Sequence, residues 1–208
     1  ILSLTDGGSA LPQLQQWIVN VPWWLSVLLV LVFASPLGNL PLSALIIRAL
    51  TAGMTPGDYP RGGATHLRLW AAERVADTSG ARNLSGATWI NNYARALGAK
   101  VGDGVQLHTL PPVTGMLTLG DHCSIEQEVD LSGYWVEGDV LHLGEISIGK
   151  NASIGARSTL MPGTRIAKDA HVEAGSCVTG EKKVKAGTRW AGSPAQRVGR
   201  ATPVSYTH

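Results

Sequence analysis

Bulky apolar residues recur at every sixth position through most of the C-terminal half of this 208-residue chain. A first run occupies Val101, Leu107, Val113, Leu119, Ile125 and Leu131. A second run occupies Ile148, Ile154, Leu160, Ile166, Val172, Val178, Val184 and Trp190. Apolar residues make up 44% of the chain, so an unbroken match at all of these positions is not a chance pattern. The period is that of a hexapeptide repeat.

A six-residue period has a direct geometric meaning. Each repeat supplies one short strand and a corner, and three repeats close a triangular coil with one apolar side chain per strand pointing to the axis. Stacked coils pair their backbones and bury a continuous apolar column. We therefore predict a mainly β fold, a parallel β-helix of about five coils over residues 99–198.

One position breaks the pattern. Counting back six residues from Ile148 leads to His142, where the repeat calls for an apolar side chain. The separation from Leu131 to His142 is one residue short of two repeats, so we expect a register break or a protruding loop within residues 132–140. Insertions in solenoids leave from one face and commonly carry the binding surface.

The N-terminal quarter has a different composition. No charged side chain lies between Asp6 and Arg48, and residues 17–34 form an apolar stretch with tryptophans near its start. As a helix this stretch is about 27 Å long, close to the roughly 30 Å of a bilayer core. We expect a membrane-associated helical segment at 17–50, in one or two passes, with a buried soluble helix as the alternative. Arginines follow it with few acids, which predicts the cytoplasmic membrane, with the C-terminal part on the cytoplasmic side.

The composition of the remaining segments predicts their roles in the chain. Residues 1–16 begin with Ile rather than Met, and we expect the chain to be part of a longer protein. Residues 51–98 are predicted to be a helical linker with helices at 66–77 and 89–97. Residues 199–208 have lost the period and are interpreted as a tail, either disordered or not native to the protein. A net charge of +2 without a basic cluster gives no indication of nucleic-acid binding.

The repeats resemble a known superfamily. The Ile-Gly pairs, the segment LMPGTRI and the closing WAGSPA are similar to those of the left-handed β-helix (hexapeptide-repeat) acyltransferases. A narrower resemblance covers nearly the whole chain through GDYPRGG, HLRLWAAERV, YARALGAKVG, LHTLPPVTG, IEQEVDLSGYW and GDVLHLG. These segments resemble a tandem C-terminal domain of the membrane-bound, poly-ε-lysine-synthase-like nonribosomal peptide synthetases.

The resemblance implies a reaction and its partners. An amine would attack an aminoacyl thioester on the phosphopantetheine arm of a carrier domain, with a histidine as general base. Sister β-helix domains or a homotrimer would complete the assembly, and membrane lipid would surround the apolar segment. Two alternatives remain: a non-catalytic β-helical scaffold, and a stand-alone acetyltransferase that uses acetyl-coenzyme A.

Candidate site residues follow from their chemistry. A base that accepts a proton from an amine titrates near neutrality, which favours His142 beside the expected loop; a buried histidine that caps the register break is the alternative. Glu128 and Asp130, with Glu126, share a strand face and could orient the histidine or hold a substrate ammonium, unless that face is simply solvated. The predicted substrate contacts are His108, Glu126, Tyr134, Trp135 and Arg157.

Metal chemistry has little support in the sequence. A zinc site like that of the β-helical carbonic anhydrases needs three converging histidines, and His108, His122, His142 and His171 lack the close-set pair of that site. The spacing of Cys123 and Cys177 matches no zinc motif. We expect neither a metal nor a tightly bound cofactor.

Overall fold

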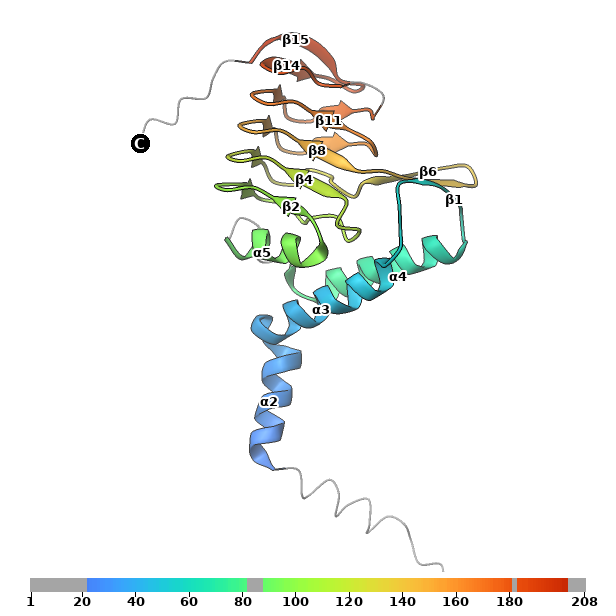
Figure 1. Cartoon of the computed structure of the whole chain (residues 1–208), viewed down its shortest axis with the longest axis vertical. Helices are drawn as coiled ribbons and strands as arrows, with labels where there is room; N and C mark the ends of the chain where they lie inside the picture. Colours follow the sequence, from blue (N-terminus) through green and yellow to red (C-terminus); the bar gives the residue numbers. More distant parts are fainter. Residues whose placement is uncertain (1–21, 82–87, 181–182, 202–208) are drawn as a thin grey trace, which may run out of the picture.

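The computed structural model describes residues 22–81, 88–180 and 183–201. Helices lie at one end of an elongated molecule and a β-helix at the other (Figure 1). The helices are α2 (Trp23–Ala34), α3 (Pro36–Thr51), α4 (Ala64–Thr78) and α5 (Thr88–Leu97). The strands are β1 (Gly57–Pro60), β2 (Lys100–Val101), β3 (Gln106–Leu107), β4 (Leu117–Leu119), β5 (Ser124–Ile125), β6 (Tyr134–Glu137), β7 (Val140–Leu143), β8 (Ile146–Ile148), β9 (Ser153–Ile154), β10 (Thr159–Leu160), β11 (Arg165–Ile166), β12 (His171–Val172), β13 (Cys177–Val178), β14 (Thr188–Ala191) and β15 (Gln196–Arg200).

The predicted parallel β-helix is confirmed. Its faces are the sheets β2-β4-β8-β11, β3-β5-β9-β12-β14-β15 and β10-β13, and all neighbours pair in parallel except β14 and β15. Every residue of the two six-residue runs is buried except Val101, which is half-buried at the first coil. Ile125 lies beside Ile154, and Val172 beside Trp190, in successive coils. The apolar period therefore forms the core column because each strand turns one side chain inward.

The predicted protrusion between residues 132 and 140 is also confirmed. Strands β6 and β7 form an antiparallel hairpin, turned at Gly138 with a positive φ of 56°. Strand β1 adds to the free edge of β7 and completes a three-stranded sheet. Figure 1 shows this sheet projecting from the side of the β-helix near α4.

The prediction that His142 occupies a position of the apolar column is wrong. Leu119 pairs with Ile148 across successive coils, so the coil between them is lengthened by the hairpin. Within β7 the side chains alternate, with Leu141 and Leu143 buried and His142 half-exposed. Counting by sixes fails here because a hairpin strand has a period of two.

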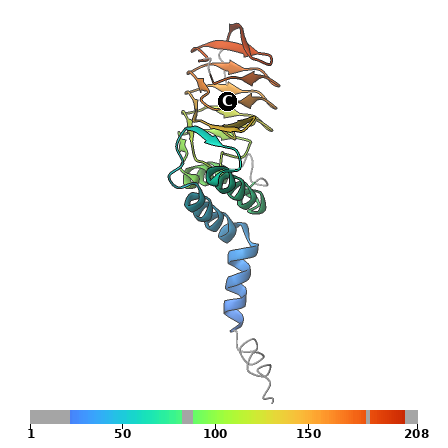
Figure 2. The same ribbon diagram turned by 90° about the vertical axis from the view of Figure 1, so that its right-hand side faces the viewer.

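The helical segment between the apolar N-terminal region and the β-helix is packed rather than extended. Helices α3, α4 and α5 form a layer beneath the first coil (Figures 1 and 2). Its core contains Ala44, Ile47, Leu69, Ala72 and Ile90. The Arg68 side chain of α4 donates to the carbonyls of Leu50 and Ala52 at the end of α3, where helical carbonyls lack intrahelical partners. The helices predicted at 66–77 and 89–97 are confirmed as α4 and α5.

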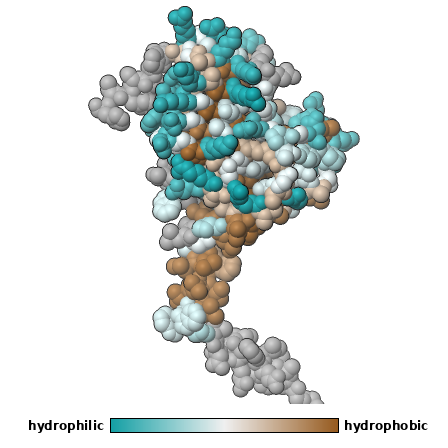
Figure 3. All heavy atoms as spheres, in the orientation of Figure 1, coloured by the Kyte–Doolittle hydropathy of each residue, from teal (hydrophilic) through white to brown (hydrophobic). Residues whose placement is uncertain are grey.

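Helix α2 extends away from this layer with apolar side chains exposed along its length (Figure 3). Trp23 is 78% exposed and Phe33 is 62% exposed. Within the described residues, neither α2 nor α3 is long and apolar enough by itself to cross a bilayer; the pair passes that test by length and composition, with a bend of 61° at the break. Residues 17–21 of the predicted apolar segment lie outside the described residues.

The C-terminal end of the β-helix differs from the predicted boundary. Gly199 and Arg200, which we assigned to the tail, lie in β15 and pair with Arg189 and Thr188 of β14. This pairing covers the last coil with an antiparallel strand. Residues 202–208 lie outside the described residues.

Candidate functional site

A cavity of about 680 Å³ lies between the helical layer and the β-helix. Helix α4 forms one wall, and the segments 108–113 and 127–132 form the other, together with Tyr134 at the base of the hairpin. The inserted hairpin and the helical layer thus enclose a space against the first coils. Among the lining residues, the carboxylates are Glu73, Asp77, Glu128 and Asp130, and Arg74 is the guanidinium.

Two of these carboxylates are paired with arginine. Arg74 Nη2 lies 2.8 Å from Asp77 Oδ2. Arg157 Nε lies 2.6 Å from Glu128 Oε2, and both side chains of that pair are exposed. Among the residues that the structure describes, Glu73 and Asp130 have no lysine or arginine within ion-pair distance, although the charge of Arg74 acts to lower the pKa of Glu73.

Glu73 is half-buried and contacts Tyr134. The Tyr134 hydroxyl donates a hydrogen bond to the Glu73 carboxylate, while burial raises the pKa of Glu73 above its usual value. Burial, together with the nearby Glu73 charge, raises the pKa of Tyr134 to about 12, so the phenol stays protonated as a donor at neutral pH. Asp130, exposed at the rim, accepts a hydrogen bond of 2.9 Å from the Ser132 backbone N–H.

His108 is the histidine among the cavity's lining residues. It directly follows β3, and its backbone N–H donates to the carbonyl of Ile125 at 3.0 Å. Next to it, Thr109 Oγ1 donates to the carbonyl of Val129 at 2.8 Å, which joins the two walls formed by the β-helix. His108 therefore lines the same space as the carboxylates, and these two bonds hold its backbone segment against the β-helix.

The structure brings together only part of the predicted site. His108, Glu128, Asp130 and Tyr134 line the cavity, whereas His142, Glu126 and Trp135 are not among its lining residues. Arg157 lies in a smaller groove that shares Gln127 and Glu128 with the cavity.

His142 lies on the three-stranded sheet. Its Nδ1 is 2.7 Å from Asp58 Oδ1, and it is paired in register with Trp135 of β6. This contact joins β1 to β7.

Sequence reasoning missed Glu73. In the predicted helix it lies four residues after Leu69 and three before Ala76, both of which are buried. Residues at these spacings share one helix face. A carboxylate on the apolar face of an amphipathic helix was therefore the signal that could have identified it.

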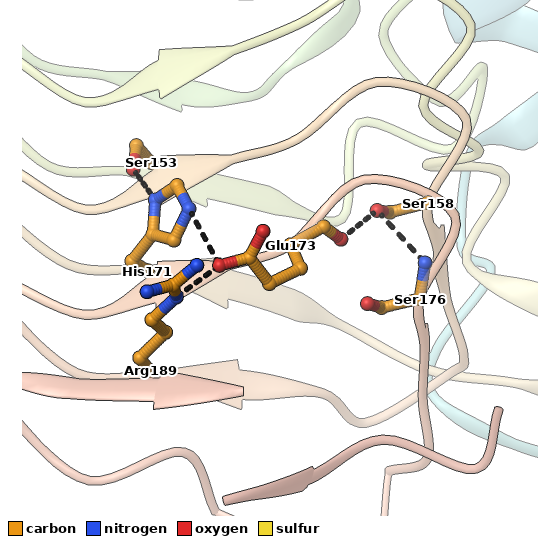
Figure 4. A network of polar contacts seen from close by, with 6 residues as sticks. All are labelled: Ser153, Ser158, His171, Glu173, Ser176 and Arg189. Atoms are coloured by element: carbon orange, nitrogen blue, oxygen red, sulfur yellow. Dashed lines mark hydrogen bonds and ion pairs between the residues drawn. The ribbon is translucent and has the colours of Figure 1, made fainter. Parts of the chain in front are cut away.

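A second polar cluster lies on the outer surface of the β-helix (Figure 4). Ser153 Oγ is 2.5 Å from His171 Nδ1, and His171 Nε2 is 3.6 Å from Glu173 Oε1. Arg189 also bonds to Glu173, and this bond is the main cause of the lowered pKa of that carboxyl. The cluster links strands of three successive coils and shares no residue with the cavity lining.

Comparisons with known proteins agree with this fold. Residues 145–180 match the family described as the hexapeptide repeat of succinyl-transferase. The chain is 33% identical over 181 residues to a delta-poly-L-ornithine synthetase of Acinetobacter baumannii, covering 86% of this chain and 14% of that protein. It is 38% identical over 71 residues to an uncharacterized protein of Dictyostelium discoideum, covering 31% of this chain and 29% of that protein. The chain thus spans less than a third of either relative.

A solved structure shares the architecture. A maltose O-acetyltransferase from Clostridium difficile 630 superposes with a TM-score of 0.50 at 16% identity, over 75% of this chain and 97% of that one. This likeness concerns the fold. The repeat match is confined to residues 145–180, and the shared architecture identifies the fold as that of hexapeptide-repeat proteins.

Proposed function

We propose that this chain is a condensing domain that forms an amide bond between an aminoacyl thioester and an amine bound in the cavity. The observation that carries this proposal is the cavity lining, which contains four carboxylates and His108. An amine acceptor arrives in water as an ammonium ion, and carboxylates attract it. A histidine is the side chain suited to take up its proton near neutral pH.

The reaction requires a defined order of proton and bond changes. His108 accepts a proton from the bound ammonium group, and the free amine then attacks the thioester carbonyl. The new C–N bond forms as the C–S bond breaks, and the sulfur leaves as a thiol after taking up the proton lost from the attacking nitrogen. His108 takes the role that the sequence pattern suggested for His142, because it is His108 that lines the cavity.

The name of one relative supports the nature of the acceptor. One relative is named a delta-poly-L-ornithine synthetase, a name that implies joining amino acids through a side-chain amine. The present chain covers 14% of it, so the thioester would be supplied by other parts of the assembly. We propose a phosphopantetheine arm on a carrier domain as the donor, and sister β-helix domains or further copies of this chain as neighbours.

We also propose that α2 and α3 attach the domain to the cytoplasmic membrane, with the β-helix on the cytoplasmic side. The exposed apolar side chains of α2 support this location, since a solvated helix of this kind would leave a large apolar area in water. Flotation of the full chain with phospholipid vesicles tests the attachment. Substituting Leu28 and Val30 of α2 with serine should leave the protein in the dense fraction.

The condensation is tested with the detergent-solubilised full chain, an aminoacyl thioester of pantetheine and L-ornithine, with dipeptide detected by mass spectrometry. We expect His108→Ala to lower the rate by about a hundred-fold or more, the contribution of a general base. His142→Ala should retain the rate. Loss of product with His142→Ala alone would contradict the assignment of the base. Absence of product from the unaltered chain would favour the scaffold, and acetylation of an acceptor by acetyl-coenzyme A would favour the acetyltransferase.

A further inference from the structure

We infer that Ser153 is an activated nucleophile on the outer surface of the β-helix, with His171 as its base and Glu173 as the group that orients the base, and that it accepts acyl groups from small thioesters. The three side chains lie together on one face of the β-helix (Figure 4). None of them is among the lining residues of the cavity. The inference therefore goes beyond the proposed condensing function and does not depend on it.

The strand pairing of the β-helix brings these side chains together. Ser153 of β9 lies directly beside His171 of β12 in the next coil, and Glu173 follows His171 by two positions. Residues two apart in a strand point to the same face. The residues that follow Ser153 and His171, Ile154 and Val172, point into the core and are fully buried. The site is thus built on paired strands rather than on a loop, which fixes its geometry.

The contact between the serine and the imidazole is the observation that carries the inference. Ser153 Oγ lies 2.5 Å from His171 Nδ1. A hydroxyl within hydrogen-bond reach of a base that a third group orients is the arrangement of an activated nucleophile. With the hydroxyl as donor, Nδ1 accepts the hydrogen bond and the imidazole proton resides on Nε2. Nδ1 is then in place to take the serine proton when Oγ forms a bond.

Glu173 favours this tautomer of the histidine. Its Oε1 lies 3.6 Å from His171 Nε2, so its negative charge stabilises a proton on that nitrogen and the imidazolium that forms during reaction. The hydrogen bond from Arg189 is the main cause of the lowered pKa of Glu173, so the carboxylate is ionised at neutral pH. The backbone of Glu173 is also held, because the Ser158 hydroxyl donates to its carbonyl at 3.0 Å (Figure 4).

The acyl transfer to Ser153 balances with the thioester as the only other reactant. The Ser153 hydroxyl gives its proton to His171 Nδ1 as Oγ attacks the thioester carbonyl carbon. The C–S bond then breaks, and the sulfur leaves as a thiol after taking the proton from Nδ1. The products are an ester on Ser153 and a free thiol, and the histidine returns to its starting tautomer.

The site is partly open to solvent. The side chains of His171 and Glu173 are 34% and 29% exposed, and Ser153 is half-buried. The three residues line neither the cavity nor the smaller groove that contains Arg157. Small donors therefore reach Ser153 directly, and we expect the acylation rate to rise in proportion to donor concentration because no donor is bound before it reacts.

The test treats the detergent-solubilised full chain with the acetyl thioester of N-acetylcysteamine and locates the acetyl groups by peptide mass spectrometry. Hydroxylamine removes esters and leaves the amides that form on lysines, so it identifies acetyl-serine. We expect Ser153 to be acetylated at least about a hundred-fold faster than Ser147, the contribution of a general base. Ser147 is the matched control, because it is also half-buried on a strand and pairs with Thr118 and Arg165 rather than with a histidine.

The variants assign the roles within the cluster. His171→Ala should lower the acetylation rate of Ser153 to about that of Ser147, and Glu173→Gln should lower it by a smaller factor. Ser153→Ala should remove the hydroxylamine-sensitive acetyl group from its peptide. Acetylation of Ser153 no faster than that of Ser147, or an unchanged rate in His171→Ala, would overturn the inference. Circular dichroism establishes that each variant is folded, and the comparison of Ser153 with Ser147 in the unaltered chain decides the matter if His171→Ala does not fold.

Discussion

Replacing Leu141 and His142 separately by alanine tests the register of the hairpin against that of the hexapeptide repeat. The two residues are neighbours in β7, and their side chains point to opposite faces of the strand. If the six-residue count continued through the hairpin, His142 would be the inward residue. The structure instead places Leu141 in the core with no exposed surface.

The expected free-energy changes differ clearly. Leu141→Ala removes a fully buried side chain, and such truncations lower the free energy of unfolding by about 2–5 kcal/mol. His142→Ala removes a contact with Asp58 in which the side chains are 37% and 68% exposed. An ion pair exposed to that extent contributes up to about 1 kcal/mol. We therefore expect Leu141→Ala to be the more damaging substitution by at least about 1 kcal/mol.

Urea unfolding of the detergent-solubilised full chain, followed by circular dichroism, measures both changes under one set of conditions. The midpoint should fall markedly for Leu141→Ala and little for His142→Ala, with similar denaturant dependence in the two variants. A larger loss in His142→Ala than in Leu141→Ala would refute the register described here. It would also restore His142 as a residue of the apolar column.

Further predictions concern buried groups. Folding raises the pKa of the Glu73 carboxyl. The stabilisation that Glu73 provides is therefore present below the pKa of the unfolded carboxyl, and it is lost as the pH rises through the pKa of the folded state. Between about pH 4 and 7, the free energy of unfolding should fall less in Glu73→Gln than in the unaltered chain. Burial raises the pKa of the fully buried Cys123 thiol to about 12. Iodoacetamide should therefore label the half-buried Cys177 first and reach Cys123 only on unfolding. Mass spectrometry of the modified peptides measures the order of labelling. Gly180→Ala should lower the unfolding midpoint, since the new methyl carbon would lie 1.9 Å from the carbonyl oxygen of Pro162 unless the backbone shifts; an unchanged midpoint would mean that the coil yields without cost.

Much of the fold could be predicted because its signal is local and repeated. A coil of the β-helix has no room at its axis for polar side chains, so the six-residue period appears directly in the sequence. The helices at 66–77 and 89–97 likewise carry their own apolar spacing and terminal signals. Of the candidate site residues, His108, Glu128, Asp130 and Tyr134 line the cavity, because the cavity lies near the insertion beside which they were sought.

The amino-acid sequence alone thus determined the β-helix, its apolar column and the place where a segment is inserted. Tertiary structure decided what the insertion does, since β1 joins β7 from more than 80 positions away and takes His142 into a contact with Asp58. It also decided that Glu73 faces the cavity, because the docking of α4 beneath the hairpin sets which side of the helix is enclosed. Period and composition describe a residue's own strand or helix, whereas a cavity arises where elements distant in the chain meet, and their relative placement depends on packing that no single segment encodes.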